Sequence, residues 1–294
     1  MAALSELING GLLGDASIGV CKSKYLFYKH VAKDRELLNW LKAQFEQNNV
    51  TNGYIVTDNK TTGCFAFGFY INKLRIPWML ALKRTWYDQL DTRQKIVPAD
   101  LQLTPTTLLH WYLGDGSMNR HGGNRKPYPV LATNCFRYSD IQLLIAKLRE
   151  IGLDFAPNRQ TGGSFVLVAR GCTTIQFFKL IGLEPPVAIA DCITGRKGRG
   201  SRLHHFRDKW PTEEDWLKLL SDEPAICSVL VAKRKQMGLT RSQFAKKAGV
   251  SYDYLKRIEW GNRQPSIMRL RQLLEAVALK PLALLEEVTK FGDD

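Results

Sequence analysis

The stretch Leu13-Gly14-Asp15-Ala16-Ser17 returns later in the chain as Leu113-Gly114-Asp115-Gly116-Ser117. Each copy ends an apolar run, which covers Leu4–Leu12 before the first copy and Leu108–Tyr112 before the second. Internal repetition of this kind indicates a duplicated structural unit. We therefore expect two equivalent helices, each of which ends in an aspartate.

Similar predicted elements surround the two copies. Thr104-Pro105 is typical of a helix start, and Ser5 is the corresponding cap candidate in the first copy. Hydrophobic periodicity after Asp15 predicts strands or helices near 17–20, 25–29, 34–47, 54–57, 64–71 and 77–87. After Asp115 the corresponding segments are 128–133, 139–151, 155–158, 164–169 and 173–181. The fold class is therefore α+β, with two pseudo-symmetric αββαββα repeats over residues 1–100 and 101–203 that carry antiparallel sheets.

The two aspartates are the first candidates for chemistry. Gly10 and Gly14 lie on one face of the first helix, where glycines let two helix backbones approach closely. Asp15 and Asp115 would then converge, and two such carboxylates repel each other unless a cation neutralises them. Carboxylates, completed by the carbonyl oxygens of Gly14 and Gly114, suit Mg²⁺, with Mn²⁺ as a substitute. The alternative is that both aspartates merely end helices at the surface.

Composition narrows the class of partner. The 294 residues include 42 Lys and Arg against 28 Asp and Glu, a net charge of +14, with 45% hydrophobic residues. These values exclude global disorder and point to a polyanion, for which nucleic acid is favoured over a membrane surface. No signal peptide or membrane span is predicted. The six cysteines form no C-x-x-C pair, so we expect no zinc site and free, mostly buried thiols in a reducing, cytoplasmic compartment.

The C-terminal part of the sequence does not repeat the pattern of the two halves. Residues 204–224 are predicted to be a linker, and residues 225–294 a separate helical domain. Leu239–Ser251 resembles the first part of a Cro/repressor-type helix-turn-helix, whose second helix enters the major groove by its N-terminal residues. The resemblance implies DNA contacts by Arg241, Tyr252, Asp253, Tyr254 and Arg257. A packing module that no longer binds DNA is the alternative.

The repeated segments also resemble a known family. Ile8–Ala16 and Leu108–Gly116 are similar to the two LAGLIDADG motifs of monomeric homing endonucleases, and the resemblance extends over about Leu4–Lys197. It implies that Asp15 and Asp115 are catalytic and bind the metal. It also implies that Lys95, in the family-like Lys95-Ile96-Val97-Pro98, is a central basic residue at the site. A solvated surface lysine is the alternative for Lys95.

Two features depart from the family pattern. The second half should carry its own basic residue after Pro185-Pro186, but residues 187–192 contain no lysine or arginine. Arg196 or Lys197 is the candidate substitute; otherwise the second site is weaker, with a nicking bias or loss of cleavage. The first motif ends Asp15-Ala16, where Asp-Gly is more typical.

The resemblance further implies that each half presents a curved sheet to the major groove. The candidate DNA-binding residues of the two halves are Lys22, Lys24, Lys29, Lys60, Arg120, Arg125, Lys126, Arg159, Gln160, Arg170, Arg196 and Lys197. Each of them could equally be a solvated charge. Two unlike halves in one chain predict a monomer and an asymmetric DNA site. His30 and His110 are expected to be structural.

These observations predict a homing endonuclease that makes metal-dependent double-strand breaks in a long asymmetric site. Its partner would be double-stranded DNA, and its location the interior of a prokaryotic or phage-infected cell. Two alternatives remain open: a non-cleaving DNA-binding regulator, and a maturase that binds its own intron RNA.

Overall fold

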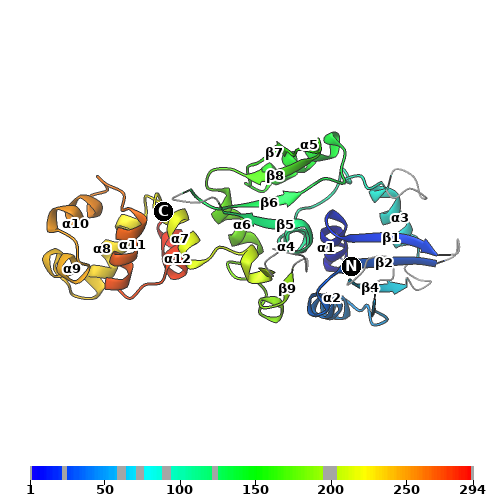
Figure 1. Ribbon diagram of the computed structural model, residues 1–294, viewed down its shortest axis with the longest axis horizontal. Coiled ribbons are helices and arrows are strands. Elements are labelled where there is room, and N and C mark those ends of the chain that lie inside the picture. The colour runs from blue at the N-terminus through cyan, green and yellow to red at the C-terminus, as the bar shows by residue number, and fades with distance from the viewer. Residues whose placement is uncertain are drawn as a thin grey trace. The chain divides into compact units, whose positions relative to one another are not determined.

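The computed structural model describes residues 2–21, 25–57, 64–70, 76–87, 94–120, 125–194 and 204–292. The chain divides into two compact units (Figure 1). The first contains residues 1–119 and 128–210, and the second contains residues 120–127 and 211–294. The first unit is the duplicated α+β part, and the second is helical.

The first repeat has the predicted order of elements. It consists of α1 (Ala2–Leu13), β1 (Ala16–Cys21), β2 (Tyr25–Ala32), α2 (Arg35–Gln47), β3 (Tyr54–Thr57), β4 (Phe65–Tyr70) and α3 (Ile76–Trp86). The strands form an antiparallel sheet in the order β1-β2-β4-β3. Asp34 caps α2 by accepting from the backbone N–H groups of Glu36 and Leu37. Ser5 lies inside α1, so its prediction as the N-cap is wrong.

The second repeat has the same order. It consists of α4 (Pro105–Asp115), β5 (Gly116–Asn119), β6 (Tyr128–Ala132), α5 (Tyr138–Glu150), β7 (Phe155–Arg159), β8 (Phe165–Ala169) and α6 (Thr173–Ile181). Its sheet has the matching order β5-β6-β8-β7. Thr104 caps α4 with Pro105 in the first turn, as predicted. The α+β fold class with two antiparallel repeats is therefore confirmed. The short segments η2 (Val187–Ile189), β9 (Ile193–Thr194), β10 (His204–His205) and η3 (Phe206–Lys209) follow.

Aromatic side chains fill the core between the sheets and their helices. In the first repeat, Phe45 of α2 lies 5.2 Å from the ring of Tyr28 and 5.3 Å from that of Phe67. In the second, Tyr112 of α4 packs against Phe177 and Trp210 at 5.1 and 5.5 Å. Because alternate strand residues face these cores, each sheet keeps one face directed away from its helices.

Helices α1 and α4 pack closely side by side (Figure 1). A Cβ atom added to Gly10 would lie 2.6 Å from the carbonyl oxygen of Thr107 and 2.6 Å from Cβ of His110. A Cβ on Gly14 would lie 3.5 Å from Cα of Gly114. The close approach predicted for Gly10 and Gly14 is thus present, and it brings the two helix ends together.

The second unit contains α7 (Glu213–Leu220), α8 (Ile226–Gln236), α9 (Arg241–Lys247), α10 (Tyr252–Glu259), α11 (Ile267–Ala276) and α12 (Pro281–Gly292). Thr240 and Ser251 cap α9 and α10, and Gly249 turns between them with a φ of +64°. This division differs from the predicted linker at 204–224. Residues up to Trp210 lie in the first unit, while α7 lies in the second and packs on α12.

Five cysteines lie among the described side chains, and all five are free thiols. Cys64 and Cys227 are buried, Cys192 is half-buried, and Cys135 and Cys172 are exposed. The expectation of mostly buried thiols is therefore wrong for this part of the chain. Within the described residues, no helix has the length and apolar character needed to span a membrane.

Candidate functional site

Asp15 and Asp115 lie at the same end of the α1–α4 pair. Asp115 is the last residue of α4, and Asp15 directly precedes β1. A Cβ atom on Gly114 would lie 3.3 Å from the backbone nitrogen of Asp15 and 3.7 Å from its Oδ2. Asp15 is exposed and Asp115 is half-buried. The structure therefore brings together the two acidic side chains that the repeat singles out.

Burial disfavours the ionisation of both carboxyl groups. The pKa of Asp115 is raised to about 6, first by desolvation and then by the negative charge of Asp15, while Lys95 and Lys209 act in the opposite direction. Desolvation also raises the pKa of Asp15, against the lowering effect of Lys209 and Lys95. A site that holds two partly desolvated carboxylates near each other gains stability from any cation that neutralises them.

Lys95 supplies a positive charge on the side of the first motif. Its Nζ donates to the carbonyl oxygens of Leu12 at 2.8 Å and Gly14 at 2.7 Å. The backbone at Lys95 forms a β-bridge with Tyr87, and the N–H of Ile96 donates to the Trp86 carbonyl at 2.9 Å. Burial lowers the pKa of this half-buried lysine. Lys95 is therefore not the solvated surface lysine of the alternative interpretation.

Lys209 occupies the corresponding place on the side of the second motif. Its Nζ donates to the carbonyl oxygens of Leu113 at 2.7 Å, Tyr112 at 3.3 Å and Gly114 at 3.4 Å. The hydroxyl of Tyr112 in turn donates to the backbone carbonyl of Lys209. Burial lowers the pKa of Lys209 to about 8, although the two aspartates act to raise it. Each aspartate thus has one lysine bound to the helix end beside it.

Lys209 was not among the residues predicted from the sequence. The second basic residue was expected after Pro185-Pro186, with Arg196 or Lys197 as the candidate, and both lie outside the described residues. A signal was present, because Lys209-Trp210-Pro211 repeats in shorter form the pattern of Lys95-Ile96-Val97-Pro98. The lack of a basic residue at 187–192 therefore leaves no gap in the second half.

The side chains at the helix ends fit a hard divalent cation. The available ligands are the carboxylates of Asp15 and Asp115 and the carbonyl oxygens of Gly14 and Gly114. Both carbonyls accept a hydrogen bond from a lysine, which leaves one lone pair on each oxygen. In the described part of the chain, no three His, Cys, Asp or Glu side chains gather as a metal site. An all-oxygen set with few protein ligands suits Mg²⁺, which usually keeps several ligands from water or substrate.

The other predicted DNA contacts fall into three groups. Lys29 lies on the face of the first sheet that is directed away from its helices, and Arg125, Arg159, Gln160 and Arg170 are exposed. Arg120 and Lys126 instead form ion pairs, at 2.7 Å with Asp215 and at 3.0 Å with Asp222. Lys22, Lys24 and Lys60 lie outside the described residues.

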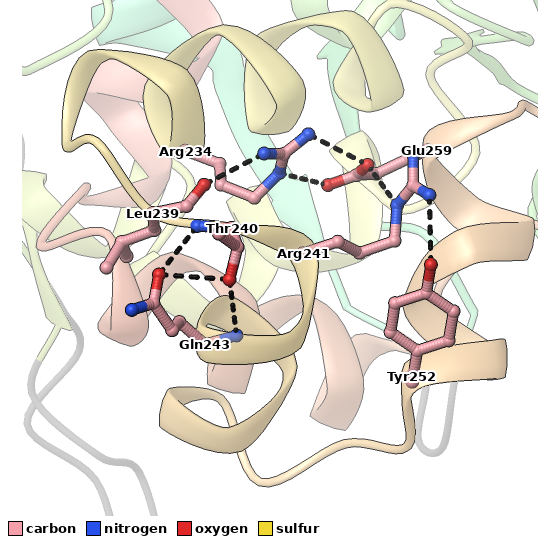
Figure 2. Close-up of polar contacts among 7 residues, drawn as sticks. All are labelled: Arg234, Leu239, Thr240, Arg241, Gln243, Tyr252 and Glu259. Atoms are coloured by element: carbon pink, nitrogen blue, oxygen red, sulfur yellow. Dashed lines mark hydrogen bonds and ion pairs between the residues drawn. The ribbon is translucent and has the colours of Figure 1, made fainter.

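A buried ion pair organises the helical unit (Figure 2). The side chain of Glu259 is 1% exposed and accepts from Arg234 at 2.6 and 3.1 Å and from Arg241 at 2.7 Å. Arg241 also lies over the rings of Tyr252 and Trp260, at 5.9 Å from each centroid. Its guanidinium therefore already has partners within the protein.

Tyr252, Asp253 and Arg257 are exposed on α10, and Tyr254 is half-buried. The guanidinium of Arg263 lies 4.9 Å from the centre of the Tyr254 ring. The predicted contacts on α10 thus share one helix, while Arg241 lies on the helix before it.

Comparison with known families gives two matches. The model of the LAGLIDADG DNA endonuclease family matches residues 5–177, and a helix-turn-helix model matches residues 230–284. A relative from Methanocaldococcus jannaschii, the uncharacterized protein MJ1098, is 30% identical over 155 residues, or 52% of this chain. The match spans 58% of the length of that relative. The predicted helix-turn-helix is thus confirmed.

A solved structure shows the same fold over part of the chain. The homing endonuclease I-WcaI bound to its DNA recognition sequence is 18% identical, with a TM-score of 0.51 over 62% of this chain and 81% of that chain. I-DmoI in complex with DNA and Mn is 13% identical, with a TM-score of 0.38 over 61% of this chain and 96% of that chain.

Proposed function

The chain belongs to the LAGLIDADG DNA endonuclease family, and from this premise we propose that it cuts both strands of a long asymmetric DNA site with the help of a divalent cation. The observation that carries the proposal is the arrangement at the end of the α1–α4 pair. Two aspartates converge there, and a lysine is bound beside each of them. In this proposal one carboxylate and one ammonium group serve each DNA strand.

Asp15 and Asp115 would hold the cation, together with the carbonyl oxygens of Gly14 and Gly114. We expect Mg²⁺, with Mn²⁺ as a substitute. When bound, the cation would supply Lewis-acid activation of water and neutralise charge at the scissile phosphate. Lys95 and Lys209 would attract the phosphate and stabilise the negative charge that develops on it during hydrolysis. Their bonds to the helix-end carbonyls keep both ammonium groups in place beside the aspartates.

The DNA would lie against the two sheets, one for each half of the site. The net charge of +14 supports binding to a polyanion, and the helix-turn-helix unit would add a second contact with the duplex. Within that unit we propose Tyr252, Asp253, Tyr254 and Arg257 as contacts, with Arg241 as a support for α10. Because the two halves differ in sequence, we expect a monomer and a site without two-fold symmetry.

A non-cleaving regulator is the second candidate, and the helix-turn-helix unit favours it. The presence of both aspartates and both lysines favours the nuclease, because a regulator has no need for a cluster of desolvated charges. A third possibility, binding to intron RNA, gains no support from any feature of the described residues.

Selection of cleaved duplexes from a random DNA library in Mg²⁺ tests the proposal. We expect one long asymmetric site, cut on both strands to leave short 3′ overhangs. Asp15→Asn and Asp115→Asn should bind the selected duplex and fail to cut it. Binding without cleavage by the unmodified chain would support the regulator, and stronger binding to structured RNA than to any duplex would support the maturase.

A further inference from the structure

The first sheet has one face that its helices leave uncovered. In β2, Leu26, Tyr28 and His30 are buried, while Phe27, Lys29 and Val31 alternate with them on the other face. The strand register extends this second set across the sheet. We define the outer face as Ser17, Gly19, Phe27, Lys29, Val31, Ala66, Gly68, Tyr70, Tyr54 and Val56.

Three aromatic rings lie next to one another on this outer face. The centroids of Phe27 and Tyr70 are 6.4 Å apart, and those of Tyr70 and Tyr54 are 5.8 Å apart with an angle of 25° between the rings. Val56 completes the patch and is 48% exposed, while Tyr70 is 47% exposed. The patch therefore extends over β2, β4 and β3.

Glycines on the neighbouring strands make room for two of these rings. A Cβ on Gly19 would lie 2.2 Å from Cζ of Phe27, so the ring lies directly over the backbone of β1. A Cβ on Gly68 would lie 3.4 Å from the hydroxyl oxygen of Tyr54. The Phe27 ring can lie along the sheet only because Gly19 has no side chain, and the Tyr54 ring lies within van der Waals range of position 68. The result is a continuous apolar surface.

Charge is almost absent from the same surface. Among the outer-face positions of the described strands, Lys29 alone carries a charge. This distribution contrasts with the net charge of +14 of the chain. Apart from Lys29, the described positions of this face therefore offer an apolar mode of recognition and no charged one.

We propose that the outer face of the first sheet recognises the C5-methyl groups of thymines in the major groove of one half-site. The inference rests on the proposed function, since it takes duplex DNA as the partner. β1 begins at Ala16, directly after Asp15, so the outer face continues outward from the aspartate pair. The thymine methyl is the apolar group that base pairs expose in the major groove, and an aromatic or aliphatic surface is its natural partner. Stacking of unpaired bases on the rings is the competing interpretation.

Replacement of thymine by deoxyuridine tests the proposal, because it removes the methyl group and leaves the hydrogen-bonding edge unchanged. The probe is the duplex selected from a random library, and binding by the full chain is measured in chelator so that no cleavage occurs. We expect each contacted thymine to lose about fourfold in affinity on replacement, the value for one buried carbon. The loss should be confined to one half of the site.

Two substitutions on the outer face link the effect to this surface. Val56→Thr keeps the size of the side chain and Tyr70→Ser removes a ring, both at exposed positions. Each substitution should bring the ratio of the affinities for the thymine and deoxyuridine duplexes toward one. Val187→Thr is the matched control, because Val187 is 93% exposed and lies outside the sheet, and it should keep the wild-type ratio.

The outcomes separate the two proposals. Specific binding that is the same for thymine and deoxyuridine duplexes would overturn the methyl proposal and leave the nuclease intact. The proposal would also be overturned if Val56→Thr and Val187→Thr changed this affinity ratio equally. Tighter binding to single strands than to duplex would overturn it as well. If no duplex is selected at all, both proposals fail.

Discussion

At the scale of single residues, the aspartate pair is costly for the fold when no cation is present. The pKa of Asp115 is raised to about 6, mainly by desolvation and then by Asp15. An unfolded aspartate titrates near 3.9. The folded state therefore binds more protons than the unfolded state between these two values, and the cost of ionising Asp115 appears as the pH rises from about 4 to about 6.

Asp115→Asn should consequently stabilise the protein at pH 7.5 in chelator. Asparagine has nearly the same shape but carries no charge to be desolvated or repelled. After allowance for solvent screening, we expect a gain of roughly 1 kcal/mol, or about 2–4 °C in Tm. The gain should shrink to a small fraction near pH 4 and vanish at about pH 3, where the wild-type carboxyl is protonated in both states. Thermal unfolding at these pH values measures the effect.

Mg²⁺ provides the complementary test of the same residue. Because a cation that binds only the folded state stabilises it, Mg²⁺ should raise the Tm of the wild type and leave that of Asp115→Asn nearly unchanged. Asp100→Asn, at an exposed position away from the helix pair, is the control and should behave as wild type throughout. A lower Tm of Asp115→Asn at pH 7.5 in chelator would contradict this electrostatic account.

At the scale of elements, the α1–α4 contact determines where the aspartates lie. Gly10→Ala would place a methyl group 2.6 Å from the backbone oxygen of Thr107, so one helix must move. Overpacking of this kind costs about 1–3 kcal/mol. We expect a lower stability and, because the ends of α1 and α4 shift together, a loss of cleavage that exceeds the loss of DNA binding.

Gly162→Ala is a matched control for this substitution, since a Cβ there meets no atom within 4 Å. Gly162→Ala should give values close to those of the wild type in both chemical denaturation and single-turnover cleavage. If Gly10→Ala cleaves DNA at the same rate as Gly162→Ala, the spacing of the two helices does not govern the active site.

The helical unit depends on the carboxylate of Glu259 in a similar way. Glu259→Gln leaves Arg234 and Arg241 without their anionic partner, and breaking a buried pair costs roughly 3 kcal/mol. We expect faster hydrogen exchange in α8, α9 and α10, with no change in α1 or α4. Glu286→Gln, at an exposed position of α12, is the control. Unchanged exchange in α8–α10 would show that the two arginines find other partners.

Local sequence signals were sufficient for most elements and failed where partners come from distant segments. The αββαββα order, the cap Thr104 and the meeting of the two aspartates follow from periodicity, a Thr-Pro pair and a repeat. Lys209 was missed because its role depends on the carbonyls of α4, which lie far away in the sequence. A count of positive charges could not show that Arg120 binds Asp215 or that Arg241 binds Glu259.

At the scale of the whole first unit, the two halves use different supports for equivalent lysines. Lys95 is held by a β-bridge to Tyr87 and by backbone pairing with Trp86. Lys209 is followed by Trp210, which is buried beside Tyr112 and donates from its indole to the carbonyl of Gly182 at 2.8 Å. A duplicated fold has thus kept the position of the ammonium group while its surroundings diverged. Each lysine can therefore be changed without disturbing the support of the other.

This separation predicts nicking enzymes of opposite strand preference. Lys209→Met removes the ammonium next to the second helix end and keeps an apolar stem, and Lys95→Met does the same for the first. If each lysine serves one phosphodiester, each variant should cut one strand at close to the wild-type rate and the other at least about a hundredfold more slowly, the usual effect of losing one charge-stabilising group. A supercoiled plasmid carrying the selected site, labelled on one strand at a time, reports both rates. Arginine at either position should restore part of the lost rate, because the positive charge returns.

Equal slowing of both strands by either variant would instead mean that the two lysines and two aspartates act as a single centre.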